Sequence, residues 1–237
     1  MMELTEETKL VTHRICTKVL SPGSSSTPTP MEPPKLLIAS MNMRGKWAPR
    51  PTDSEVLNVT SMQGKIRQER LDYSPMHLEN YKGFACFENY WQSGKRWKEL
   101  LHHIKPDEHR EWVKMWSDMT KPTRKSKKTK GMTVHDAIFG GVPMDYVTSR
   151  KLVYVPEYYE YMTKRSKTLQ KYKDYLKNGK TVVIYDFDGP RKADGGVEIL
   201  KCSKPLLIDK LNDTSFPFGH GYVVAMALLG IEPGELL

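Results

Sequence analysis

The chain has 237 residues, of which 38% are apolar and 27% are charged, as in a globular protein somewhat poor in core residues. Its longest apolar run, residues 222–231, contains a glycine and is far too short to cross a bilayer, so no membrane span is expected. The formal net charge of +9 favours polyanionic partners such as nucleic acid or nucleotides.

The first 34 residues are predicted to form a flexible N-terminal arm. Residues 21–34 read SPGSSSTPTPMEPP, which offers few groups for burial and many that break regular structure. Such a stretch is typical of a linker. The remainder, residues 35–237, is therefore expected to fold as a single domain.

The first half of this domain contains two strand candidates and two helix candidates. KLLIA, from Lys35, and EVLNVTS, at residues 55–61, have the apolar and β-branched residues of strands. A helix is predicted over about residues 88–103. A second helix begins at Pro106 with acidic residues in its first turn, where they suit the helix dipole. Its apolar residues recur at helical spacing and predict a buried stripe: Trp112, Met115, Trp116 and Met119.

The second half of the domain adds more helices and strands. A long helix is predicted from Pro156 to about Asn178, followed by strands at residues 181–187 and 197–202. A glycine-rich turn then enters a last helix within residues 218–230. The order of these elements predicts an α+β fold, with a small mixed β-sheet surrounded by helices.

Two aspartates, Asp186 and Asp188, follow the apolar strand TVVIYDF. This arrangement resembles the nucleophile loop of haloacid dehalogenase phosphatases, in which one Asp attacks phosphorus and Mg²⁺ assists. The chain after Asp188 is too short for the βα units that such a sheet still needs, and Pro190 stands where that superfamily has Thr or Val. A phosphatase is therefore only a minor alternative, and the two carboxylates need another explanation.

A second group of polar residues lies in GFACFENYWQSGK, residues 83–95. Glu88, Gln92 and Lys95 are spaced i, i+4, i+7, which on a helix places them within about 40° of one another. Aromatic residues, among them Trp91, occupy an adjacent stripe. The spacing fits a binding row beside an aromatic wall, and it also fits a surface Glu–Lys helix with an apolar underside.

Three segments in this order resemble the NADAR family. GFACFENYWQSGK is similar to that family's Glu-containing signature helix, VVIYDFDGP (182–190) to its strand followed by Asp, and FPFGHGYVVAMALLG (216–230) to its glycine-rich closing segment. The resemblance spans roughly residues 35–232. Here Phe187-Asp188-Gly189 stands in place of the family's Trp-Gly, and His220 stands nearest to its Asn.

The resemblance implies a NADAR-like fold and N-glycosidic chemistry on ADP-ribose or ADP-ribosylated bases. Cleavage of a ribosyl C–N bond passes through an oxocarbenium-like state, which one carboxylate stabilises while another orients or deprotonates water. Glu88 and Asp186 are the catalytic candidates, with Asp188 as the alternative to Asp186.

Ligand-binding candidates come from the same segments. Lys95 could pair with a phosphate or hold Glu88 ionised, Gln92 could hydrogen-bond a ribose hydroxyl or a base edge, and Trp91 could stack on a base or belong to the core. Neither a metal nor a cofactor is expected.

The closing segment supplies three further ligand-binding candidates. Gly219 and Gly221 would permit close backbone approach, and the N–H groups at the following helix start would suit a pyrophosphate. His220, between them, could face the ligand or cap the helix.

An alternative function is nucleic-acid binding or association with a virion, without catalysis. KPTRKSKKTK, residues 121–130, could contact a phosphate backbone through Arg124, Lys125, Lys127 and Lys128, although a solvated loop explains these charges as well. Three widely spaced cysteines form no zinc or redox pattern. They favour an intracellular location. Residues 58–76, NVTSMQGKIRQERLDYSPM, resemble divergent relatives in large DNA viruses and phages, which implies the cytoplasm or nucleus of a host cell, or a virion.

Overall fold

The structure is a computed structural model that describes residues 35–42, 46–61, 67–100, 105–123, 129 and 131–236. All of them belong to one unit of the chain, residues 33–237. The expected N-terminal arm, residues 1–34, lies outside the described residues. The described part is an α+β fold, as predicted.

The largest sheet in the described residues has four strands, β1 (Leu36–Ser40), β2 (Ser54–Asn58), β8 (Thr181–Asp186) and β9 (Ile199–Lys201), in the order β2-β8-β1-β9. All four lie where the sequence predicted strands. β8 is parallel to both β1 and β2, while β9 is antiparallel to β1. Asp186 is the last residue of the inner strand β8, at the carboxyl edge where ligands of parallel sheets commonly bind.

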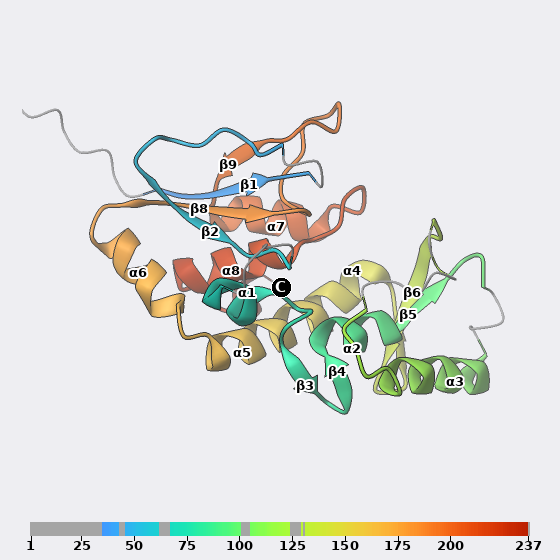
Figure 1. The fold of residues 1–237 in the computed structure, drawn as a ribbon. Helices are drawn as coiled ribbons and strands as arrows, with labels where there is room; N and C mark the ends of the chain where they lie inside the picture. The colour runs from blue at the N-terminus through green and yellow to red at the C-terminus, as the bar shows by residue number, and fades with distance from the viewer. Residues whose placement is uncertain are drawn as a thin grey trace, which may run out of the picture. The chain divides into compact units, whose positions relative to one another are not determined.

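Helices cover one face of this sheet, as Figure 1 shows. Alternate strand residues, such as Ile38 and Ile184, belong to the core cluster that also contains α8 (His220–Leu229), because successive side chains of a strand point to opposite faces. The intervening residues Ala39 and Val183 belong to a separate cluster on the other face. The other helices of this region are α1 (Gln68–Tyr73), α6 (Leu169–Lys177) and α7 (Lys204–Asn212). A short 3-10 helix, η4, covers Pro233–Leu236.

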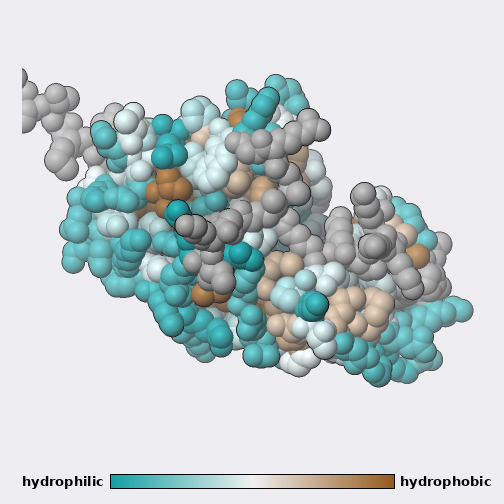
Figure 2. All heavy atoms as spheres, in the orientation of Figure 1, coloured by the Kyte–Doolittle hydropathy of each residue, from teal (hydrophilic) through white to brown (hydrophobic). Residues whose placement is uncertain are grey.

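A second region contains a three-stranded antiparallel sheet, formed in the described residues by β5 (Lys95–Trp97), β6 (Val134–Phe139) and β7 (Val142–Met144). It is accompanied by the hairpin β3 (Glu79–Tyr81) and β4 (Phe84–Cys86), and by the helices α2 (Phe87–Ser93) and α3 (Pro106–Ser117). In Figure 2, residues of higher hydropathy lie over β4 and α2, whereas hydrophilic residues cover α3 and α6.

The stripe predicted on α3 is buried in part. Trp112 and Trp116 are 5% and 0% exposed and form a cluster with Phe84 and Trp97, whereas Met115 and Met119 are only partly buried against it. None of the helices in the described residues is long and apolar enough to cross a membrane.

The helix predicted over residues 88–103 is wrong in its extent, because α2 ends at Ser93 and Lys95–Trp97 forms β5. The break occurs at Gly94, where an added Cβ would lie 2.2 Å from the Phe139 ring. Pairing of β5 with β6 replaces the helical hydrogen bonds that the local sequence would have allowed. Residues 101–104 lie outside the described residues.

The single helix predicted over residues 156–178 is also wrong, since it is two helices, α5 (Val155–Arg165) and α6. The chain breaks at residues 166–168, where the buried Asp72 carboxylate accepts hydrogen bonds from Lys167 N (3.0 Å) and Thr168 N (2.8 Å). A distant side chain thus satisfies the N–H groups that would otherwise continue the helix. α5 is preceded by α4 (Tyr146–Ser149) and by one π-helical segment, η3 (Arg150–Tyr154).

Candidate functional site

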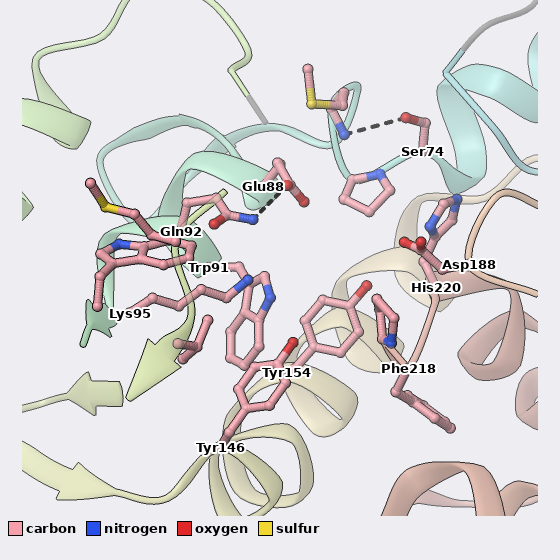
Figure 3. Close-up of a pocket in the computed structure, with 16 residues that line it drawn as sticks. Ser74, Glu88, Trp91, Gln92, Lys95, Tyr146, Tyr154, Asp188, Phe218 and His220 are labelled. Atoms are coloured by element: carbon pink, nitrogen blue, oxygen red, sulfur yellow. Dashed lines mark hydrogen bonds between the residues drawn. The ribbon is translucent and has the colours of Figure 1, made fainter. Parts of the chain in front are cut away.

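A cavity of about 620 Å³ lies among α2, β5, α4, η3, the loop after β8 and the start of α8 (Figure 3). The size falls within the range of about 300–1,000 Å³ typical of small-molecule sites. Six of the predicted site residues line it: Glu88, Trp91, Gln92, Lys95, Asp188 and His220.

The α2 side of the cavity presents Glu88 and Gln92 as a linked pair. Gln92 Nε2 donates a hydrogen bond to Glu88 Oε1 at 2.8 Å. Because an ionised carboxylate only accepts hydrogen bonds, this contact fixes which amide atom faces Glu88. Gln92 Oε1 is then a buried acceptor without a hydrogen-bond partner among the described residues. The pair therefore retains capacity to accept hydrogen bonds from a ligand.

Lys95 lies on β5, not on the helix of Glu88, and nevertheless reaches the same cavity. Its side chain is almost fully buried, and Nζ lies 4.9 Å from the centroid of Trp91 and 5.8 Å from that of Tyr146. Both contacts have the geometry of cation–π interactions. The Lys95 ammonium is thus a positive charge in the wall of the cavity, held against ring faces. An anionic group of a ligand could pair with it.

Tyr146 stands between two cations. The Arg150 guanidinium lies 4.3 Å from the ring centroid of Tyr146, on α4. Burial acts to raise the pKa of the Tyr146 phenol, but the charges of Lys95 and Arg150 outweigh it, so the pKa is lowered from its usual value. The neighbouring Tyr154 phenol, by contrast, has a pKa raised by burial and by surrounding acidic groups.

The opposite side of the cavity is built on Asp186, which is 1% exposed. Asp186 Oδ2 accepts a hydrogen bond from Gly221 N at 2.8 Å, and Oδ1 accepts one from Asp188 N at 3.4 Å. The carboxylate thus sits at the start of α8, where the helix dipole favours a negative charge. These contacts fix the loop after β8 against α8.

His220 links Asp186 to a third segment of the chain. His220 Nε2 lies 2.8 Å from the backbone oxygen of Val59, and because a carbonyl can only accept, Nε2 carries a proton. His220 Nδ1 lies 3.4 Å from Asp186 Oδ2. His220 therefore lines the cavity and also connects Asp186 to Val59 within the protein.

Gly219 and Gly221 have no Cβ, which allows the Asp186 side chain to pack against the start of α8. A Cβ on Gly219 would lie 2.5 Å from Asp186 Oδ2, and one on Gly221 would lie 2.9 Å from Asp186 Cβ. The group that approaches these glycines closely is a carboxylate of this chain. Contact of these glycines with a pyrophosphate stays a prediction.

Asp188 differs from Asp186 in its position. Asp188 is exposed and lines the cavity that Glu88 also lines, whereas Asp186 lies within the wall behind it. Of the two predicted partners of Glu88, Asp188 is thus the one whose surroundings leave room for a ligand. Figure 3 shows Glu88 and Asp188 on opposite sides of the drawn cavity, with the tyrosine rings below.

Sequence reasoning missed Tyr146, Tyr154 and Arg150. Arg150 is 1% exposed, and its guanidinium donates to the backbone oxygens of Asp213 (2.6 Å) and Phe216 (2.9 Å), which positions the loop before α8. The π-helical segment that carries Arg150 and Tyr154 is a feature often found at functional sites. The Asp145 cap of α4 is the sequence signal that could have located this helix start.

The predicted nucleic-acid contacts Arg124, Lys125, Lys127 and Lys128 lie outside the described residues. In the part of the chain that is described, no three His, Cys, Asp or Glu side chains are grouped as a metal site would require.

A scan against protein-family models finds no family that matches this chain, and searches of curated proteins and of solved structures find no match either.

Proposed function

We propose that this protein is a NADAR-like N-glycosidase that acts on ADP-ribose or on ADP-ribosylated bases. The observation that carries the proposal is the meeting of Glu88, Gln92, Lys95 and Asp188 in one cavity. They come from α2, from β5 and from the loop after β8, segments far apart in the sequence. A cavity that gathers two carboxylates, a buried ammonium and aromatic rings suits a ribosyl compound that carries phosphate and base.

The proposed reaction breaks the ribosyl C–N bond and leaves its electron pair on the departing base nitrogen. The positive charge that develops on the ribosyl C1 and ring oxygen is stabilised by the Glu88 carboxylate. Water adds to C1, and its proton passes to Asp188 and then to the solvent or to the leaving base. Glu88 is held in one orientation by Gln92, so little reorganisation precedes the reaction.

Lys95 would bind the negative charge of the ligand. Its ammonium is enclosed by the faces of Trp91 and Tyr146, and a phosphate would provide the hydrogen-bond acceptors that ring faces provide only weakly. The same rings offer a surface for the sugar or for a base.

The test is hydrolysis of ADP-ribosylated DNA by the wild type and by Glu88→Gln, with released ADP-ribose as the readout. We expect the wild type to release ADP-ribose and Glu88→Gln to be slower by a factor of about 100 or more. Glu88→Gln should still bind ADP-ribose in calorimetry, since the replacement is nearly isosteric. The control Glu111→Gln alters a carboxylate on α3, in a different element, and should behave as the wild type.

The proposal is wrong if neither protein releases ADP-ribose and neither binds it. In that case the net charge of +9 would favour the non-catalytic alternative, a basic nucleic-acid-binding protein. Its test is the salt dependence of nucleic-acid affinity after Lys/Arg→Ala replacement across residues 124–130. An unchanged slope would remove this loop from the binding surface.

A further inference from the structure

A second groove adjoins the cavity on the far side of Asp188. It has a volume of about 210 Å³, and both Asp188 and Pro217 line the groove as well as the main cavity. The groove is smaller than the roughly 300–1,000 Å³ of a site for a whole drug-sized ligand. Its position and size suit one part of a ligand whose other part occupies the main cavity.

Aromatic side chains form two sides of the groove. Phe187 follows β8 and is partly buried, while Phe216 lies in the loop before α8 and is 44% exposed. Arg150 holds the backbone oxygen of Phe216 from the protein interior, so this exposed ring stands on a fixed support. An exposed phenyl ring leaves apolar surface in contact with water in the free protein. Because its backbone is fixed, the ring also offers a stacking face to a ligand.

Arg191 supplies the polar side of the groove. Its Nη2 donates hydrogen bonds to the backbone oxygens of Met41 (2.8 Å) and Phe187 (2.7 Å), which fix the plane of the guanidinium. The remaining guanidinium N–H groups have no hydrogen-bond partner among the described residues, and Arg191 lines the groove. A planar donor beside two rings can stack on a heterocycle or hydrogen-bond its ring nitrogens.

We propose that this groove is a subsite for an aromatic heterocycle of nucleobase size, with Phe216 and Phe187 as its stacking surface and Arg191 as its donor. The heterocycle would belong to the ligand whose ribosyl group lies in the main cavity, so the inference rests on the proposed function and extends it. Asp188, at the junction, would lie next to the sugar that joins the two parts. The chain would thus recognise a nucleotide from both of its ends.

The test compares AMP with ribose 5-phosphate, two probes that differ only by the base, in saturation-transfer NMR and in titration calorimetry. We expect AMP to bind the wild type more tightly than ribose 5-phosphate. Phe216→Ala should weaken AMP binding about tenfold, the effect of losing one base–aromatic stack, and should leave ribose 5-phosphate unchanged. The control Leu229→Ala, which truncates another exposed apolar side chain at 38% exposure, should alter neither.

Two results would overturn the proposal. One is equal AMP affinity for the wild type and Phe216→Ala. The other is a loss of AMP binding in Trp91→Leu without a loss in Phe216→Ala, which would place the base in the main cavity. Glu88→Gln separates this subsite from the proposed reaction, because it should slow hydrolysis by a factor of about 100 or more while AMP binding persists.

Discussion

The wall at the carboxyl end of β8 fixes its polar groups through backbone contacts, whereas the wall formed by α2 and β5 leaves polar atoms facing the cavity. Asp186 and His220 have contacts with Gly221 and Val59, which belong to α8 and to the segment after β2. Gln92 and Lys95 have a carboxylate and ring faces as their neighbours. We infer that the first wall contributes mainly to stability and the second mainly to ligand contact.

The largest expected effect is that of Gly219→Ala in the first wall. The new Cβ would lie 2.5 Å from Asp186 Oδ2 and 3.0 Å from the backbone oxygen of Asp188, so either the loop after β8 or α8 must move. We expect a loss of about 3 kcal/mol in the free energy of unfolding in urea, as for an overpacked core site. Gly234→Ala, where no atom lies within 4 Å of the added Cβ, is the matched control. Equal losses in both variants would contradict the close packing of Asp186 against α8.

Asp186→Ala and Asp188→Ala sharpen the comparison, because they remove carboxylates two residues apart. Asp186→Ala leaves Gly221 N buried without its acceptor and should cost about 2 kcal/mol of unfolding free energy. Asp188→Ala removes an exposed side chain and should cost about 0.5 kcal/mol or less, while it lowers hydrolysis. Urea unfolding measures the two stability losses, and the hydrolysis assay measures the two activities. A larger stability loss in Asp188→Ala than in Asp186→Ala would show that Asp186 is not the structural carboxylate of the pair.

Gln92→Leu tests the second wall. Gln92 Oε1 is a buried acceptor without a partner among the described residues, and its loss should offset the lost hydrogen bond to Glu88. We expect unfolding free energy to change by about 1 kcal/mol or less, since a similar apolar volume replaces the amide. ADP-ribose binding should weaken at the same time. A large destabilisation would instead show that this wall is held by its polar contacts.

The smallest effect concerns Tyr146 and pH. The pKa of its phenol is lowered in the folded protein, because Lys95 and Arg150 outweigh burial, whereas an unfolded tyrosine titrates near about 10. The unfolded state then binds more protons, so the contribution of Tyr146 to stability rises with pH and is fully present only above about pH 10. The stability difference between wild type and Tyr146→Phe should therefore grow as the pH rises toward about 10.

The same measurement in the Lys95→Met background provides the control for this linkage. Removing the ammonium raises the pKa of Tyr146, so the growth of the difference with pH should shrink. A difference that falls as the pH rises would show that the two cations do not govern this phenol.

Much of the fold follows from local sequence. The four strands of the main sheet, the start of α3 at Pro106 and the helix after the glycine-rich turn are all where apolar periodicity and turn residues predicted them. The left-handed φ of 79° at Gly179 fits the predicted helix end. Apolar periodicity, a proline at a helix start and glycines at turns and helix ends are local signals, so these elements could be predicted from short stretches of sequence.

Contacts between distant residues account for the errors. Asp72 ends α5 and starts α6 from about a hundred residues away in the chain, and the Phe139 ring at Gly94 separates α2 from β5. Neither contact can be predicted from a short stretch of sequence, because the two residues that make it lie in different elements.

The sequence by itself determined which chemical groups are present: two aspartates after a strand, a Glu-Gln pair one helical turn apart, a lysine, and glycines before a helix. Only the tertiary structure decided how they are used, since it enclosed Asp186 at the start of α8 and left Asp188 at the cavity. The physical reason is that burial and hydrogen-bond partners depend on segments that meet only in the folded chain, whereas residue type and spacing are local.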